Sequence, residues 1–277
     1  MKYALCQELF ENRSWDDQCR TMARLGYTGA EVAPFCICAH PRDLLPTDRH
    51  RLRETAETHG IEVIGLHWLL AKTSGLHLTA DDPRIRAATA DYLALLADLC
   101  ADLGGSIMVF GSPAQRSLRE GLTREEGIDR AVETFKACMP CLGERGVTLC
   151  LEPLTTKETN FINTCADAAE IIERISHPSI ALHQDVKAML GEGAPLPELI
   201  QRFKTITKHF HVNDSNLLGP GMGETDYVPI FRALRETGYS GWISVEVFDY
   251  SPGADHIGRE SIEYMRRINA QLDAATP

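Results

Sequence analysis

The hydrophobic pattern of this chain alternates between short apolar runs and longer segments with helical periodicity. The short runs predict strands at residues 2–7, 28–34, 61–68, 106–112, 147–153, 179–185, 206–214 and 241–248. The longer segments predict helices at residues 14–26, 45–60, 81–104, 123–146, 163–176, 195–204, 228–238 and 257–273. Strand–helix units that follow one another without a linker favour a parallel sheet closed into a barrel. We therefore expect an α/β protein, a single (β/α)8 TIM barrel that spans residues 1–277 as one domain.

Four residues of types that bind metal ions stand at the carboxyl ends of the last four predicted strands. They are Glu152, Asp185, His211 and Glu246. The carboxyl ends of the strands in such a barrel meet at one face, and this face carries the active site in enzymes of the fold. Three carboxylates and one imidazole form an oxygen-rich set that suits Mn²⁺, Mg²⁺ or Co²⁺ and also admits Zn²⁺. The pattern therefore predicts a site for one divalent metal ion.

Each of these residues alone has an ordinary structural explanation. A glutamate or aspartate at a strand end often caps a helix or closes a turn, and a lone histidine is often a hydrogen-bonded core residue. Glu246 fits such an explanation least, because its alternation with Val245 and Val247 turns it toward the barrel lumen, where a carboxylate needs a partner. Residues of metal-binding types occur at the ends of four successive predicted strands, and this repetition favours a metal site over four unrelated structural roles.

Further polar residues lie near the same strand ends. His67 and Trp68 end the third predicted strand and are candidates for contacts with a substrate, while Glu31 lies within the second. His183 and His209 each lie two residues before a predicted metal ligand, so they share its face of the strand. His183 is a further candidate for substrate contact. For both His183 and His209, a supporting position beneath the metal ligands is at least as well supported as contact with a substrate.

Charge and hydropathy narrow the range of partners. The formal net charge of −11 and the pI near 5.4 are unfavourable for a surface that must neutralise a phosphate backbone, so we expect no nucleic-acid partner. No stretch approaches the roughly 18 apolar residues of a membrane span. The first residues do not resemble a signal peptide. We expect a cytoplasmic protein with no membrane partner.

The nine cysteines are an odd number and several lie within predicted strands or helices. This distribution indicates reduced thiols that pack as small core residues. Cys138 and Cys141 form a C-x-x-C pair, but they follow a helical segment instead of a strand-to-helix turn, which disfavours a redox or zinc role. Pro140, between them, is expected to kink or shorten that helix.

Several segments resemble one known family. They are LEPLTTKETN, HQD, HFHVNDSN, PGMGETDYVPIFRALRETGYSGW and SVEVF. Over essentially the whole chain, the sequence is similar to the xylose-isomerase-like sugar (phosphate) isomerase/epimerase superfamily, and it looks closest to ketose 3-epimerases, including those that act on fructoselysine-type substrates. The resemblance implies that Glu152, Asp185, His211 and Glu246 bind one divalent ion. It also implies that Glu152 and Glu246 form the acid–base pair and that Glu158 contacts the substrate.

Two departures from the family pattern concern specificity. Ketohexose 3-epimerases of this group carry a histidine where this chain has Ala188, and an arginine where it has Leu217. Both family residues hold the substrate, so their absence points away from a free ketohexose. Lys187 could bind an anionic substrate group, but a solvated loop lysine is the more ordinary expectation at that position.

The resemblance implies an isomerase or epimerase of a keto-sugar or sugar derivative, in which a proton is removed next to a metal-bound carbonyl to form an enediolate. A lyase on the same scaffold, a dehydratase or decarboxylase of a keto-sugar acid, begins with the same step and remains an alternative. The AP endonuclease IV family shares the fold, but it uses more histidine ligands and a basic face. Barrels of this kind often pair, so a dimer or tetramer is a further expectation.

Overall fold

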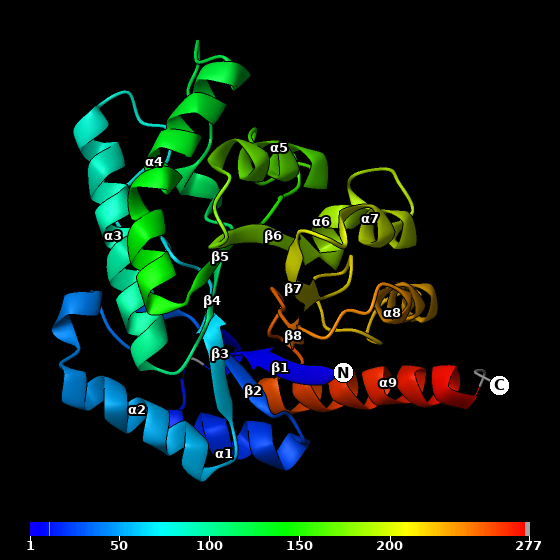
Figure 1. Ribbon diagram of the computed structural model, residues 1–277. Coiled ribbons are helices and arrows are strands. Elements are labelled where there is room, and N and C mark those ends of the chain that lie inside the picture. Colours follow the sequence, from blue (N-terminus) through cyan, green and yellow to red (C-terminus); the bar gives the residue numbers. More distant parts are fainter. Residues whose placement is uncertain (11, 275–277) are drawn as a thin grey trace.

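The computed structural model describes residues 1–10 and 12–274, and its centre is a closed barrel of parallel strands (Figure 1). In chain order, the strands are β1 (Lys2–Cys6), β2 (Gly29–Val32), β3 (Glu62–Leu66), β4 (Ile107–Phe110), β5 (Thr148–Leu151), β6 (Ile180–Asp185), β7 (Thr207–Val212) and β8 (Trp242–Val245). Each strand pairs in parallel with the next, and β8 pairs with β1. The predicted (β/α)8 TIM barrel is therefore confirmed.

Helices surround the strands on the outside of the barrel (Figure 1). They are α1 (Trp15–Leu25), α2 (Pro46–Thr58), α3 (Pro83–Asp102), α4 (Arg124–Arg145), α5 (Cys165–Ile175), α6 (Val186–Leu190), α7 (Leu196–Phe203), α8 (Tyr227–Glu236) and α9 (Ala254–Ala274). Short 3₁₀ helices occur at η1 (Gln7–Phe10), η2 (Pro34–Cys36), η3 (Pro41–Asp43) and η4 (Pro113–Gln115). Within the described ranges, no helix is both long enough and apolar enough to cross a membrane.

Local sequence signals account for most helix ends. Ser14 and Thr123 accept hydrogen bonds from the backbone of the first turns of α1 and α4, and Gly26 and Gly146 close these helices in the left-handed conformation. Pro140 does not shorten the helix, because α4 continues past it to Arg145. Pro140 lies on the solvent-exposed side of α4, so water can reach the backbone carbonyl that loses its helical donor there.

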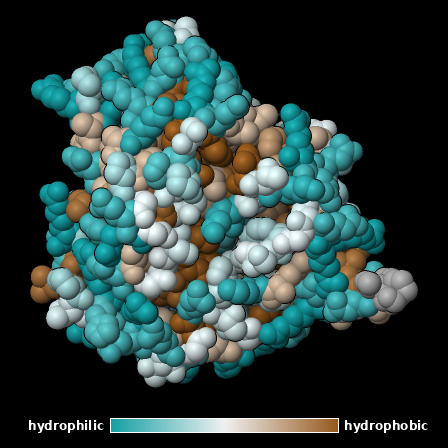
Figure 2. All heavy atoms as spheres, in the orientation of Figure 1, coloured by the Kyte–Doolittle hydropathy of each residue, from teal (hydrophilic) through white to brown (hydrophobic). Residues whose placement is uncertain are grey.

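The protein has two apolar clusters and a polar region inside the barrel. The main core lies between the strands and the helices, while a smaller, separate apolar cluster on the strands includes Ile64, Val109 and Trp242. Toward the carboxyl ends of the strands, the lumen becomes polar, with residues such as His209 and Glu31 at 0% exposure. No disulfide joins the cysteines of the described residues. The view in Figure 2 shows a largely hydrophilic surface with hydrophobic side chains concentrated in its middle.

Candidate active site

The four predicted metal ligands come together at the carboxyl-terminal end of the lumen. Glu152 and Glu246 directly follow β5 and β8, Asp185 ends β6, and His211 lies near the end of β7. The side chains point inward because alternate residues of a strand face the same side. All four are buried, with exposures of 7% for Glu152, 6% for Glu246, 1% for Asp185 and 0% for His211. The parallel topology thus gathers residues that are far apart in the sequence.

Asp185 combines a structural contact with a place in this cluster. One carboxylate oxygen accepts a hydrogen bond from the backbone N–H of Ala188 at 2.8 Å and so caps α6. The other accepts from the side-chain amide of Asn213 at 2.5 Å. A carboxylate has about four acceptor positions, so these bonds leave room for a metal ion. The capping role and the predicted ligand role are therefore compatible.

Glu246 is held by two histidines. Its Oε1 lies 3.2 Å from Nδ1 of His67, and its Oε2 lies 3.2 Å from Nδ1 of His211. The second nitrogen of His67 lies 2.8 Å from the carboxylate of Glu8, so His67 bridges two buried acids. Burial alone would raise the pKa of Glu246, but the neighbouring His211 and His67 bring it well below its usual value. These surroundings favour the charged form of Glu246.

Glu152 lies in a different environment from Glu246. Burial raises the pKa of the Glu152 carboxyl well above its usual value, and repulsion by Glu246 and Asp185 adds to this effect. Arg116 is fully buried and donates a hydrogen bond at 2.6 Å to the backbone carbonyl of Glu152, which anchors the main chain at the end of β5. The two glutamates therefore differ in the groups that hold their carboxylates, although both lie in one cluster.

A cleft opens beside the two glutamates. Its lining residues are His67, Trp68, Val109, Gly111, Ser112, Pro113, Glu152, Leu154, Glu158, Glu246 and Phe248. Trp68 and Ser112 adopt φ angles of 53° and 45°, a left-handed conformation that is uncommon for non-glycine residues. The Ser112 hydroxyl accepts a hydrogen bond from Leu70 N–H at 3.3 Å, which ties the two loops together. This wall is strained and fixed, as is common in binding sites.

The predicted substrate contacts divide into two groups. His67, Trp68 and Glu158 line the cleft, whereas His183 does not. His183 is 0% exposed, and its Nε2 lies 3.9 Å from the nearer carboxylate oxygen of Glu152. Neither ring nitrogen has a hydrogen-bond partner among the described residues. The geometry places His183 within the buried cluster, beside Glu152, and lends no support to a direct substrate contact.

Lys187 is not the solvated loop lysine that we expected. Only 12% of its side chain is exposed, and its ammonium group forms an ion pair with Glu158 at 2.8 Å. The same group lies 3.9 Å from the centre of the Phe248 ring, a cation–π contact. The expectation failed because α6 begins directly after β6 and turns Lys187 inward toward the cleft wall. Lys187 therefore stands behind two residues that line the cleft.

Sequence reasoning missed three residues that support this site: Glu8, Arg116 and Asn213. Asn213 lies two residues after His211, so period-two alternation could have placed it on the same face. Glu8 lies in the 3₁₀ helix η1 after β1, and Arg116 directly follows η4 after β4, where no sequence period indicates the direction of a side chain. Contacts of that kind depend on the tertiary structure.

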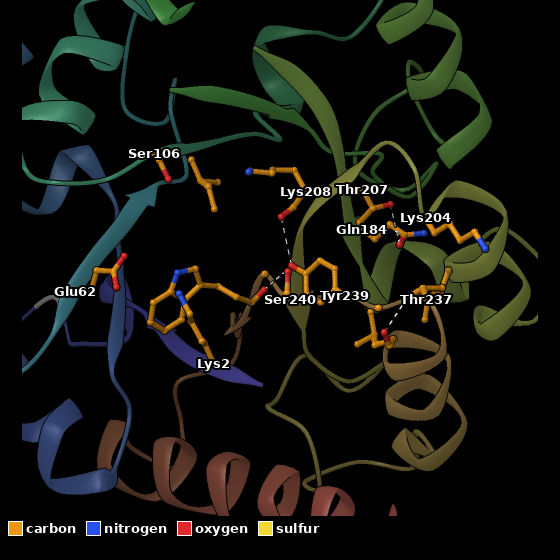
Figure 3. A pocket seen from close by; sticks show the side chains of 16 residues that line it. Lys2, Glu62, Ser106, Gln184, Lys204, Thr207, Lys208, Thr237, Tyr239 and Ser240 are labelled. Carbon is orange, nitrogen blue, oxygen red and sulfur yellow. Dashed lines mark hydrogen bonds between the residues drawn. The ribbon is translucent and has the colours of Figure 1, made fainter. Parts of the chain in front are cut away.

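A larger hollow lies at the opposite, amino-terminal end of the barrel (Figure 3). Figure 3 shows Lys2, Lys204, Lys208 and Tyr239 among its lining residues. Of the described residues that line it, only Glu62 carries a carboxylate, and none is a histidine or a cysteine. Its larger size therefore does not make it the candidate site, because it lacks the buried carboxylates and histidines that gather at the carboxyl-terminal end.

The cluster fits a divalent cation. Glu152, His183, Asp185 and His211 each offer a ligand atom, and these atoms lie within 4.8 Å of one another. Glu246 adds an oxygen 3.2 Å from His211. Within the part of the chain that the structure describes, none of the three carboxylates forms an ion pair with a lysine or arginine. Buried carboxylates at this density need a positive partner, and a metal ion would supply it.

Gly111 creates the space for the carboxylate of Glu152. A Cβ atom at residue 111 would lie 2.3 Å from Oε2 of Glu152. We expect Gly111→Ala to displace this carboxylate and to lower turnover by about 10 to 100-fold, because small misplacements of a reacting group have effects of that order. The backbone is not in collision, so the midpoint of urea unfolding should change little. Steady-state kinetics and urea denaturation together measure the two effects.

Gly143→Ala is the matched control for this substitution. Gly143 lies within α4, and an added Cβ would meet its nearest neighbour at an ordinary 3.5 Å. Alanine also favours a helix over glycine by up to about 1 kcal/mol, so this variant should keep full activity and equal or greater stability. Unchanged turnover in Gly111→Ala would contradict the assigned role of Gly111.

Comparison with known proteins identifies the family. Residues 19–268 match the family model described as xylose isomerase-like TIM barrel. The D-psicose 3-epimerase of Enterocloster bolteae is 25% identical over 267 residues, which cover 94% of this chain and 86% of that protein. The fructoselysine 3-epimerase of Escherichia coli O157:H7 is 23% identical, with coverage of 90% of this chain and 91% of that protein.

A solved structure agrees with this result at the level of the fold. The D-psicose 3-epimerase from Clostridium cellulolyticum H10, solved with D-tagatose, superposes with a TM-score of 0.86 at 20% identity. The superposition covers 97% of this chain and 99% of that chain. The matched family model spans nearly the whole barrel, including every strand from β2 to β8. The chain belongs to the xylose isomerase-like TIM barrel family.

Proposed function

We propose that this protein is a divalent-metal-dependent epimerase of a keto-sugar or sugar derivative, with Glu152 and Glu246 as its acid–base pair. The relatives named as epimerases of psicose and fructoselysine support an enzyme that acts on sugars. The proposed metal ligands are Glu152, Asp185, His211 and Glu246. A cation bound there would act as a Lewis acid that polarises the substrate carbonyl and acidifies the neighbouring C–H bond.

One observation carries this proposal: two carboxylates enter a single cleft from different sides of the barrel. Glu152 follows β5 and Glu246 follows β8, and two strands separate β5 from β8 in the barrel. Both side chains line the cleft. A substrate between them would have one carboxylate on each face. Removal of a proton on one face and its return on the other inverts the carbon, which is an epimerisation.

The surrounding residues hold the proton-transfer groups in place. His67 contacts Oε1 of Glu246 and is itself held by Glu8, so the Glu246 carboxylate has a fixed orientation. Arg116 fixes the main chain of Glu152. An epimerase acts in both directions, so each glutamate serves as the base in one direction and as the acid in the other. Rigid positioning of both carboxylates is consistent with this requirement.

Two positions at which this chain departs from the ketohexose 3-epimerases favour a substrate other than a free ketohexose. Ala188 is buried beside Asp185 and offers no polar group, and Leu217 is an exposed apolar residue, 42% accessible. We propose that the Glu158–Lys187 pair provides polar recognition at the cleft wall.

We expect Lys187→Met to weaken substrate binding more than it slows the reaction. Without the ammonium group, Glu158 loses its charged partner at 2.8 Å and its fixed orientation. A partly buried charged hydrogen bond of this kind contributes about 1 to 2 kcal/mol, so KM should rise about tenfold while kcat changes less than threefold. Initial-rate kinetics measure the split. Lys157→Met removes an exposed lysine that precedes Glu158 in the chain and should leave KM unchanged.

The function is tested with keto-sugars and their amino-acid derivatives in D₂O. We expect the metal-loaded protein to give an isomeric product that carries one deuterium at the inverted carbon. Nuclear magnetic resonance locates the deuterium, and mass spectrometry gives the product mass. A product that has lost water or carbon dioxide would reject epimerisation and favour a lyase.

A further inference from the structure

Beneath the proposed metal ligands, a single glutamate connects two histidines inside the barrel. Oε2 of Glu31, on β2, lies 2.9 Å from Nε2 of His209 and 3.0 Å from Nε2 of His211, both on β7. All three residues are 0% exposed. Because β2 and β7 lie apart in the barrel, these contacts cross the lumen. Glu31 is therefore a buried acid whose main contacts are two imidazoles.

Other contacts of Glu31 do not explain its burial. The thiol of Cys6, on β1, lies 3.9 Å from the same Oε2, which is a long and weak contact. Oε1 of Glu31 has no hydrogen-bond partner among the described residues. A buried carboxylate has a substantial desolvation cost unless charged or strongly hydrogen-bonded groups offset it. In this lumen, the two imidazole N–H groups supply that compensation.

These contacts determine where His211 carries its proton. An ionised carboxylate only accepts hydrogen bonds, so Nε2 of His211 must be the donor. The other ring nitrogen, Nδ1, then keeps its lone pair when the ring is neutral, and it faces Oε2 of Glu246 at 3.2 Å. Two acceptors at that distance need a proton or a metal ion between them, and a metal ion that binds there takes the place of the proton. Nδ1 is therefore the atom that His211 offers to a cation.

We propose that Glu31 is a positioning residue that holds the proton on Nε2 of His211 and so presents Nδ1 as the metal ligand. The proposal rests on the proposed function only through the ligand role of His211. A carboxylate behind a ligating histidine fixes its tautomer and ring orientation, and removal of such a group typically weakens metal binding by 10 to 100-fold. His209 completes the arrangement because it holds the same oxygen of Glu31 from the layer below.

The first test observes the wild-type protein without any substitution. Protein labelled with ¹⁵N at histidine is examined by long-range ¹H–¹⁵N spectroscopy, with the His211 signals assigned by their loss in His211→Gln. We expect a proton on Nε2 of His211 before and after addition of Zn²⁺, and a shift of Nδ1 on addition. Coordination through Nε2, or an Nε2 without a proton, would overturn the proposal.

The second test measures metal affinity. We expect Glu31→Gln to bind Mn²⁺ and Zn²⁺ about 10 to 100-fold more weakly by calorimetric titration, with near-native circular dichroism. Glu62→Gln makes the same chemical change at an exposed position on β3 and should keep wild-type affinity. Affinity within twofold of wild type in folded Glu31→Gln would overturn the role of Glu31. Should this variant fail to fold, the wild-type spectrum still decides.

The two proposals fail in different ways. If the wild-type protein does not bind Zn²⁺ or Mn²⁺, the ligand set is wrong and the proposed function falls with it. If it binds through Nε2 of His211, or if Glu31→Gln binds normally, only the positioning role of Glu31 is rejected.

Discussion

Glu246→Gln is expected to lower the rate of epimerisation by about 10³-fold. The amide cannot accept a proton from carbon, and general base catalysis of this kind contributes about 10² to 10⁴-fold. His67 and His211 both contact the Glu246 carboxylate at 3.2 Å, so the substitution also disturbs the groups that hold it. The measurement is exchange of the substrate proton for deuterium in D₂O, followed alongside product formation.

Two comparisons isolate the loss of the base from other effects. Metal content per chain, measured by mass spectrometry, shows whether Glu246→Gln still binds the cation, and rates are compared at saturating metal. Glu263→Gln removes a carboxylate from the exposed side of α9 and should react at the wild-type rate. Full deuterium exchange in Glu246→Gln would refute the assignment of this residue as a proton-transfer group.

Removal of divalent cations is expected to abolish activity and to lower thermal stability. Glu152, Asp185 and Glu246 are at most 7% exposed, and repulsion among them contributes to the raised pKa of Glu152. A cation would neutralise this repulsion. At a free concentration 100 times its Kd, a ligand that binds only the folded state stabilises it by about 2.7 kcal/mol. For a chain of this size, that corresponds to an increase in Tm of roughly 5 to 10 °C.

Thermal unfolding of chelator-treated protein with Mn²⁺, Co²⁺, Mg²⁺ or Zn²⁺ measures this effect and ranks the ions. We expect Mn²⁺ or Co²⁺ to restore the highest turnover, because the set is rich in oxygen ligands. Asp185→Asn is the informative variant, since it keeps an oxygen that can cap α6 but loses a charge at the site. The increase in Tm on addition of metal should be smaller for this variant than for the wild-type protein. Unchanged Tm and full activity after chelation would contradict a metal-dependent site.

Much of the fold follows directly from local patterns. Alternating apolar runs and amphipathic segments predicted each strand of the barrel, and caps such as Ser14 and Thr123 predicted helix starts within about one residue. The sequence pattern could not predict that α6 and α7 would both occupy the connection between β6 and β7. A helix of five residues has little periodicity of its own, and α6 exists because Asp185 caps it.

The site could be predicted only in part. Local sequence patterns indicate where a side chain lies, but they do not indicate which distant residues it contacts. Period-two alternation and parallel topology are enough to bring Glu152, Asp185, His211 and Glu246 to one end of the lumen. The same reasoning cannot give the partner of any of them. Whether Lys187 faces solvent or Glu158 depends on the direction of the first turn of α6.

The sequence by itself therefore determined the architecture, the end of the barrel at which the candidate site lies and the residue types that gather there. These features depend on local periodicity and on the order of the strands. Only the tertiary structure decided which atoms meet: Glu31 with His211 across the lumen, His67 between Glu8 and Glu246, and Lys187 behind Glu158. Such contacts join residues far apart in the chain, so they exist only once the barrel has closed.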